Sequence, residues 1–365
     1  MLKLAKGLLR RLVMLIVLCF FALGASCASV TNSLVTLMPG VLNDPSNRTL
    51  RREILSFGSD QFCKELKKRG APLRMSDGAP IMGRFFVTQC EYKEQDNGDV
   101  FVQFSGFGYG WTQPTRRLGF SATGAVQYNQ DFLLDGSTMY AYFRPRGTPI
   151  TTFKTEMMES REQSGGIGVL MSGMFGMDQT ANRIGQQLLS EELKKGFTVI
   201  REGNATTDFG LGIVEKGARP FHPFQIHGSD KVQLANERCE IHEQQRDFIG
   251  PFEVDENGRA IYVTMILDGT PAVDVFVVKK DAGDAWVNEY VYKPGVTQAW
   301  VPLLLTDVLR TGADWRRTAP LQKGLYYLVI DHSSAAGPAS PPVTPTGGSD
   351  SPAVVSYVVQ LGDAP

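Results

Sequence analysis

The first 26 residues constrain this chain most, because they determine the compartment in which the rest of it folds. Four basic residues, Lys3, Lys6, Arg10 and Arg11, precede an almost wholly apolar run from Leu12 to Gly24. A basic segment, an apolar segment and then small residues form the pattern of an export signal. The run has about 13 residues, well short of the roughly 20 that a membrane-spanning helix needs. We therefore predict that residues 1–26 are a signal peptide and that the mature protein folds outside the cytoplasm.

The end of this leader carries a resemblance to a known class of proteins. The segment Leu23-Gly24-Ala25-Ser26-Cys27 resembles the lipobox of bacterial envelope lipoproteins, in which a small residue precedes a cysteine that is lipidated. It departs from that pattern at Gly24, where the family prefers Leu, so ordinary peptidase cleavage after Gly24 or Ala28 is the alternative. The resemblance implies a lipid on Cys27. Ala28, in the next position, implies the outer membrane in that family.

Length and composition limit the fold of the mature chain. About 340 residues remain after the leader, which at roughly 100 to 200 residues per domain predicts two domains. Hydrophobic residues make up 42% and charged residues 21% of the chain, and the formal net charge is −1. These values are ordinary for a globular protein, and without a basic excess we expect no nucleic-acid partner. No cofactor is predicted.

The cysteines leave two interpretations open. After the leader the chain has Cys27, Cys63, Cys90 and Cys239. In an oxidising compartment Cys63 and Cys90 could form a disulfide, which would stabilise the protein by about 3 kcal/mol. The alternative is that both are buried free thiols.

The first half predicts an α+β domain. Residues 27–48, rich in Ser, Thr, Asn and Pro, are expected to be a tether, and residues 49–227 the domain. Apolar residues at helical spacing predict one long helix between Leu50 and Gly70 and a second over Asp178–Lys195. Between them, alternating residues predict an antiparallel sheet, followed by a polar loop over residues 144–164. The predicted strands are Met82–Tyr92, Val100–Trp111, Gly119–Tyr128 and Thr138–Phe143.

The second of these strands has the sharpest local pattern. Phe107, Tyr109 and Trp111 alternate with three glycines, so that one face of the strand is aromatic and the other is bare backbone. Bare backbone in a strand indicates a bend or the close approach of a helix or ligand. The aromatic face could contact an apolar ligand or a partner, or it could be sheet core. We select these three residues as the candidate apolar contact surface.

Residues 228–365 predict an all-β sandwich domain. Strand-like runs cover Arg259–Leu267, Ala272–Val278, Leu325–Ile330 and Ala353–Leu361. The segments Gly324–Asp331, Asp274–Val278 and Val355–Val359 resemble strands of the bacterial pre-peptidase C-terminal type of β-sandwich. In that family the module is a non-catalytic accessory domain, so the resemblance implies binding or spacing rather than chemistry. The predicted fold class is thus an α+β N-terminal domain, with two long helices and an antiparallel sheet, plus an all-β C-terminal sandwich.

Catalytic signatures are weak throughout. We find no nucleophile elbow, phosphate-binding loop or zinc-protease motif. His222, His227, Cys239 and His242 lie within 21 residues and form one candidate metal cluster, although unrelated residues near a domain boundary are the commoner explanation.

These features together predict an exported, lipid-anchored, non-catalytic envelope protein, located at the outer membrane and facing either side of it. It would act as a binding or scaffolding module, with an envelope protein or an apolar ligand as its partner. The alternatives are a metal-dependent extracytoplasmic hydrolase that uses the histidine and cysteine cluster, and a structural subunit of an envelope assembly.

Overall fold

The structure is a computed structural model, and it describes most of the chain after residue 69. Besides single positions between residues 43 and 67, the described ranges are 70–112, 115–160, 177–202, 205–226, 230–296, 302–339 and 351–365. The predicted leader and most of the tether and first helix therefore lie outside the described residues. In the described part, neither helix is long and apolar enough to cross a membrane.

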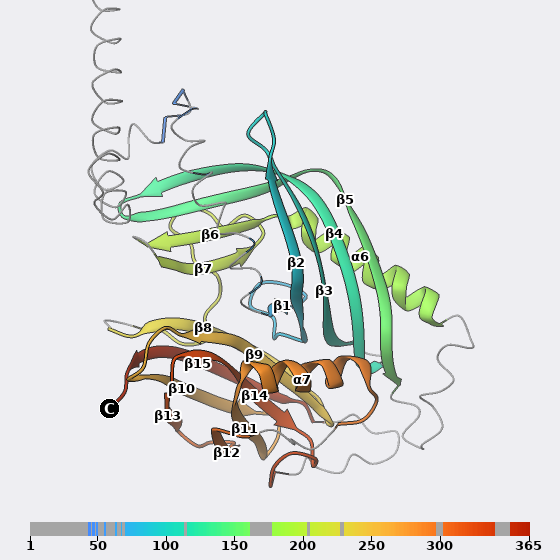
Figure 1. The fold of residues 1–365 in the computed structure, drawn as a ribbon, viewed down its shortest axis with the longest axis vertical. Coiled ribbons are helices and arrows are strands. Elements are labelled where there is room, and N and C mark those ends of the chain that lie inside the picture. Colours follow the sequence, from blue (N-terminus) through green and yellow to red (C-terminus); the bar gives the residue numbers. More distant parts are fainter. Residues whose placement is uncertain are drawn as a thin grey trace, which may run out of the picture.

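The N-terminal half is built on one antiparallel sheet of seven strands in chain order. Its two longest strands, of 21 and 23 residues, bend over as an arch (Figure 1). Long, strongly curved strands of this kind accumulate the right-handed twist of the sheet. The strands are β1 (Ala71–Leu73), β2 (Gly83–Glu94), β3 (Val100–Thr112), β4 (Thr115–Asp135), β5 (Thr138–Ser160), β6 (Phe197–Glu202) and β7 (Ala205–Leu211).

One helix, α6 (Met177–Lys195), packs on this sheet. Its Leu189 and Leu193 contact a cluster of buried apolar side chains that includes Phe143 and Phe197. The helix ends with Lys194 and Lys195, whose positive charges stabilise the C-terminal end of the helix by interacting with its dipole. The prediction of a long helix over residues 178–195 is confirmed.

The C-terminal half contains two four-stranded antiparallel sheets, in the orders β13-β10-β15-β8 and β12-β11-β14-β9. Alternate residues of both sheets, such as Ile261, Val275 and Val355, form the apolar core between them. Helix α7 (Lys280–Tyr292) connects β11 to β12 and lies against the arch (Figure 1). The strands are β8 (Val232–Ile241), β9 (Gln245–Val254), β10 (Arg259–Asp268), β11 (Ala272–Lys279), β12 (Leu305–Arg310), β13 (Trp315–Leu321), β14 (Gly324–His332) and β15 (Ala353–Asp363).

The predicted fold class is wrong. Strands predominate in the described chain, and the N-terminal half is not an α+β domain with two long helices. The expected polar loop over residues 144–164 is instead strand β5 as far as Ser160. The pairing of β5 with β4 skips between Arg146 and Ile150, so the residues between them, Gly147 and Pro149 among them, lie in a bulge. Bulges tolerate both residue types, and the chain therefore continues as a strand through an apparent break.

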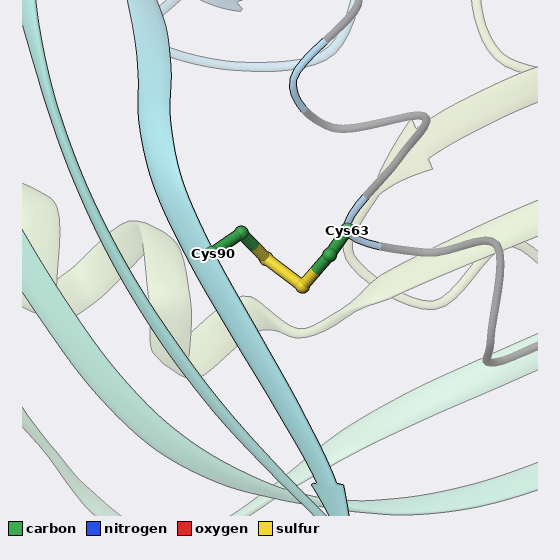
Figure 2. The surroundings of a disulfide bond; sticks show 2 residues. All are labelled: Cys63 and Cys90. Carbon is green, nitrogen blue, oxygen red and sulfur yellow. A yellow bond between two sulfur atoms is a disulfide. The ribbon is translucent and has the colours of Figure 1, made fainter.

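A disulfide joins the segment before the first strand to the sheet. Cys63 is bonded to Cys90 of β2, with their Cα atoms 5.4 Å apart (Figure 2). Cys239 is a buried free cysteine.

Candidate functional site

The aromatic stripe of β3 lies at the seam between the two halves. Tyr109 is only 3% exposed, and its ring lies 5.0 Å from that of Tyr290 in α7. The ring of Phe107 lies 6.2 Å from that of Tyr292. Trp111 contacts the imidazole of His242 at 4.1 Å between ring centroids. Each of the three predicted contact residues thus meets the chain's own C-terminal half, with Tyr109 buried and Phe107 and Trp111 partly buried at this seam.

The opposite face of β3 is covered by aromatic rings of the neighbouring strands. A Cβ atom added to Gly108 would lie 2.7 Å from the ring of Phe120, and one added to Gly106 would lie 2.9 Å from the ring of Phe85. The same Cβ positions would overlap backbone carbonyls of β2. The expected close approach at these glycines is therefore to strand β2 and to aromatic rings, rather than to a ligand.

A buried ion pair crosses the seam beside Tyr109. The Nε and Nη2 atoms of Arg84 donate to the two carboxylate oxygens of Asp247 at 2.7 and 2.8 Å. The Tyr109 hydroxyl donates to Asp247 at 2.8 Å and accepts the N–H of Phe248 at 2.7 Å. Arg84 also donates to the hydroxyl of Tyr357 at 2.8 Å. Four side chains from four strands are thus linked in one hydrogen-bonded network, a geometry in which charged hydrogen bonds are strong.

Burial sets the protonation of this network. Burial raises the pKa of Tyr109, and the neighbouring Asp247 carboxylate raises it further, so the phenol stays protonated as a donor. Burial by itself would lower the pKa of Arg84, but Asp247, Tyr357 and Glu237 together outweigh it and raise that pKa. The pair is therefore ionised and compensated, as a structural ion pair requires.

Two further buried arginines lie beside the seam, and the first of them crosses it. Arg117 of β4 is fully buried, donates to Glu159 at 2.7 Å and lies 4.2 Å above the ring of Tyr290. It also donates to the backbone carbonyls of Lys293 and Gly295 at the end of α7. All three of these hydrogen bonds are donated by Nη2, and they hold the residues that follow α7 against the arch.

Arg246 of β9 pairs with the buried Asp331 of β14 and lies 4.6 Å above the ring of Trp286 in α7. The backbone N–H of Arg246 donates to the hydroxyl of Tyr290 at 3.0 Å. These contacts join the second sheet of the sandwich to the helix that lies on the arch.

One small cavity lies in this seam. Its lining includes Gly83 and Tyr109 from the arch and Gln245, Asp247 and Tyr290 from the C-terminal half. It has room for about one water molecule and is too small for a substrate. The seam is therefore a packed and hydrogen-bonded joint.

The three described candidate metal ligands, His222, Cys239 and His242, have different neighbours. His222 contacts Asp208 of β7 at 2.8 Å, whereas His242 contacts Glu240 at 3.1 Å. Cys239 is buried, and burial first and the nearby Asp247 second raise the pKa of its thiol. His227 lies outside the described residues. Among the described residues, no three His, Cys, Asp or Glu side chains lie together in a way that could hold a metal ion.

The sequence contains one sign of the seam, namely charged residues in or beside the apolar parts of strands. Arg84 interrupts an apolar run in β2, and Arg246 and Asp247 directly precede the apolar residues of β9. A charged side chain within a strand that is otherwise apolar is expected to have a buried partner. Which charge pairs with which depends on the packing of the two halves, and spacing along the chain does not reveal it.

Cys27, the predicted lipidation site, lies outside the described residues.

The architecture of the chain is an arched sheet joined to a pair of sheets. Comparison with known proteins does not assign it to a family. No protein family matches the sequence, and no curated protein matches it either. Among solved structures, one of infectious bursal disease virus, Gx strain, is 11% identical over 81% of this chain and 68% of its own, with a TM-score of 0.20. A GH32 beta-fructofuranosidase of Bombyx mori is 9% identical over 75% of this chain and 65% of its own, with a TM-score of 0.14.

Proposed function

We propose that this chain is an exported bacterial envelope protein, held at a membrane by lipid on Cys27, that acts as a rigid binding or scaffolding module. The observation that carries the scaffolding part is the seam. Arg84 and Asp247, two ionised groups, are buried between the halves with their hydrogen bonds satisfied. A small displacement of one half would leave a charge buried without its partner, which costs about 3–5 kcal/mol, so the two halves resist sliding relative to each other.

The disulfide supports the export part of the proposal. Cys63 and Cys90 are joined, and disulfides persist in oxidising compartments outside the cytoplasm. This agrees with a leader that has the pattern of an export signal. Phe107, Tyr109 and Trp111, which the sequence predicts to be a contact surface, instead pack between the two halves.

The proposal is tested by the intact mass of protein extracted from membranes with detergent. We expect the mass of diacyl or triacyl lipid on the mature chain, and recovery in the outer-membrane fraction. A Cys27→Ser variant should lack that mass and leave the membrane fraction after a high-salt wash. Because Cys27 begins the predicted tether and lies before the predicted domains, the variant should unfold at the same temperature as the parent protein.

A mature chain without lipid, or a Cys27→Ser variant that fractionates like the parent, would overturn the tethering part of the proposal. A parent protein that stays in the cytoplasm would overturn the whole of it.

A further inference from the structure

Two buried carboxyl groups lie side by side on one face of the second sheet of the sandwich. Asp274 of β11 and Asp331 of β14 stand opposite each other in the strand register, and both are 0% exposed. Their neighbours Val275 and Ile330 belong to the core between the two sheets, so the two aspartates lie on the opposite face, where α7 packs. The Cβ atoms of directly opposite residues in antiparallel strands are about 4.5–5.5 Å apart, so the two carboxyl groups are within reach of each other.

Only one of the two carboxyl groups has a cationic partner among the described residues. The Oδ2 atom of Asp331 accepts a hydrogen bond from Nε of Arg246, whereas its Oδ1 atom is buried without a hydrogen-bond partner in that part of the chain. The oxygens of Asp274 accept the backbone N–H of Ala339 at 3.2 and 3.1 Å. With both groups ionised, one buried negative charge would therefore have no counter-charge.

A proton on Asp274 supplies what this pair lacks. Burial raises the pKa of Asp274 to about 6, and the nearby Asp331 adds to the increase. Burial also raises the pKa of Asp331, although Arg246 and Ser333 oppose that increase. Two carboxyl groups at such a distance favour holding one proton between them. The O–H of protonated Asp274 can then donate to Oδ1 of Asp331.

The other elements around Asp274 bring no further partner for its charge. In β12, Arg310 stands diagonally across from Asp274 in the register, and its side chain is exposed. Helix α7 presents Trp286, whose ring lies 4.6 Å from the guanidinium of Arg246. His332 follows Asp331 in β14 and therefore points to the other side of the sheet, where it contacts Thr270.

A short segment after β14 covers Asp274. We call this segment, residues 333–339, the strap, and it contains no titratable side chain. A Cβ atom added to its Gly337 would lie 2.3 Å from the carboxyl carbon of Asp274. Ala336 packs against the apolar cluster of α7, and Ala339 is 8% exposed. Because the strap keeps water from Asp274, moving it away would relieve the cost of burying an ionised carboxylate.

We propose that the strap is a pH-dependent cover, which closes over Asp274 while its carboxyl group carries a proton and opens when that proton passes to water. The sign follows from linkage: the closed state binds the proton more tightly than the open state, in which the carboxyl group is hydrated. Closure is therefore fully favoured below about pH 4 and weakens as the pH rises to about 6. The proposal does not depend on lipid at Cys27.

The test is hydrogen exchange of the Ala339 amide in the purified full-length mature protein, at several pH values from 4.5 to 7.5. Dividing each rate by the intrinsic rate at the same pH gives the equilibrium constant for opening. We expect this constant to rise about 20-fold over the range and to level off above about pH 6. It should not change in dilute urea, because opening a short segment exposes little surface, whereas global unfolding exposes much.

Two variants and a matched control separate the strap from general effects of charge. Asp274→Asn replaces the carboxyl group by an amide that can donate to Asp331, so opening should be rare and independent of pH. Gly337→Ala places a methyl group against Asp274 and should hold the strap open at every pH. Asp268→Asn, at an exposed position of β10, makes the same change of charge and should keep the pH response of the parent.

An opening constant of the parent that stays the same from pH 4.5 to pH 7.5 would overturn the proposal. So would a rise that Asp274→Asn retains, or an exchange rate that increases in dilute urea. If Asp274→Asn does not fold, Gly337→Ala decides, since a variant that is as closed as the parent at pH 4.5 would contradict the role of the strap.

Discussion

Two buried aspartates show how differently the same residue type is treated in this molecule. Asp247 receives both donors of Arg84 and the hydroxyl of Tyr109. Asp274 of β11 is equally buried, but it receives only the backbone N–H of Ala339 and lies opposite Asp331 in the strand register. Burial, partly offset by that N–H, raises the pKa of Asp274 to about 6. The carboxylate of Asp247 is therefore fully hydrogen-bonded, whereas that of Asp274 destabilises the fold when ionised.

Asp274 predicts a pH dependence of stability. Its pKa is higher in the folded than in the unfolded state, so between about pH 4 and pH 6 the folded state binds more protons. The free energy of unfolding should therefore fall as pH rises through this window, by at most about 3 kcal/mol for this group. Asp274→Asn should remove this part of the slope and be more stable than the parent at pH 7. Urea unfolding at pH 4.5 and pH 7 measures both, and an identical slope in the variant would contradict the prediction.

At the scale of elements, the arch is shaped by where other elements approach its backbone. A Cβ atom added to Gly119 of β4 would lie 1.8 Å from the carbonyl oxygen of Val291 in α7. Gly119 stands opposite Tyr109 in the register, at the centre of the seam. The helix can lie this close to the strand only because no side chain intervenes.

Gly119→Ala should therefore separate α7 from β4. Overpacking of this kind costs about 1–3 kcal/mol, and the backbone contact places Gly119 at the upper end of that range. Gly110→Ala on β3 is the control, because its Cβ would lie no closer than 3.4 Å to another atom. Thermal unfolding compares the two variants, and equal losses of stability would show that the approach of α7 is not what selects glycine.

At the scale of the molecule, the two halves share one of the main apolar clusters. Phe86 and Tyr109 of the arch pack with Phe248, Trp286 and Tyr290 of the C-terminal half. Beside this cluster run the ion pairs and arginine contacts of the seam. The division at residues 227 and 228 separates the sheets, since no sheet of the described chain includes strands of both halves, but it does not separate the cores.

We predict from this that the two halves unfold together. Calorimetry should record one transition whose van't Hoff and calorimetric enthalpies agree, as expected when a shared core couples two units. Arg84→Met leaves Asp247 buried without its charge partner and should lower the free energy of unfolding by about 3–5 kcal/mol. Two well-separated transitions in the parent protein would show that the seam is weaker than its contacts indicate.

Much of the secondary structure was accessible from local patterns. The strand-like runs over residues 259–267, 272–278, 325–330 and 353–361 correctly indicated β10, β11, β14 and β15. Helix α7 lies in the half that the sequence predicts to be wholly β. Strand β5 continues through Pro145 and Pro149, where the sequence predicts a loop. Both errors have one cause: long-range contacts decide whether a break or an amphipathic stretch continues as a strand or folds as a helix.

The sequence by itself determined the periodicity of the strands and of α6, and the alternation of aromatic residues with glycines in β3. These are local properties, set by backbone geometry and by the side chains nearest in the chain. Only the tertiary structure decided what that aromatic face meets, which charge compensates Arg84, and that the described candidate metal ligands form no metal-binding group. Such contacts join residues up to 273 positions apart, as between Arg84 and Tyr357, and they form only when whole sheets pack. No spacing within a strand encodes them.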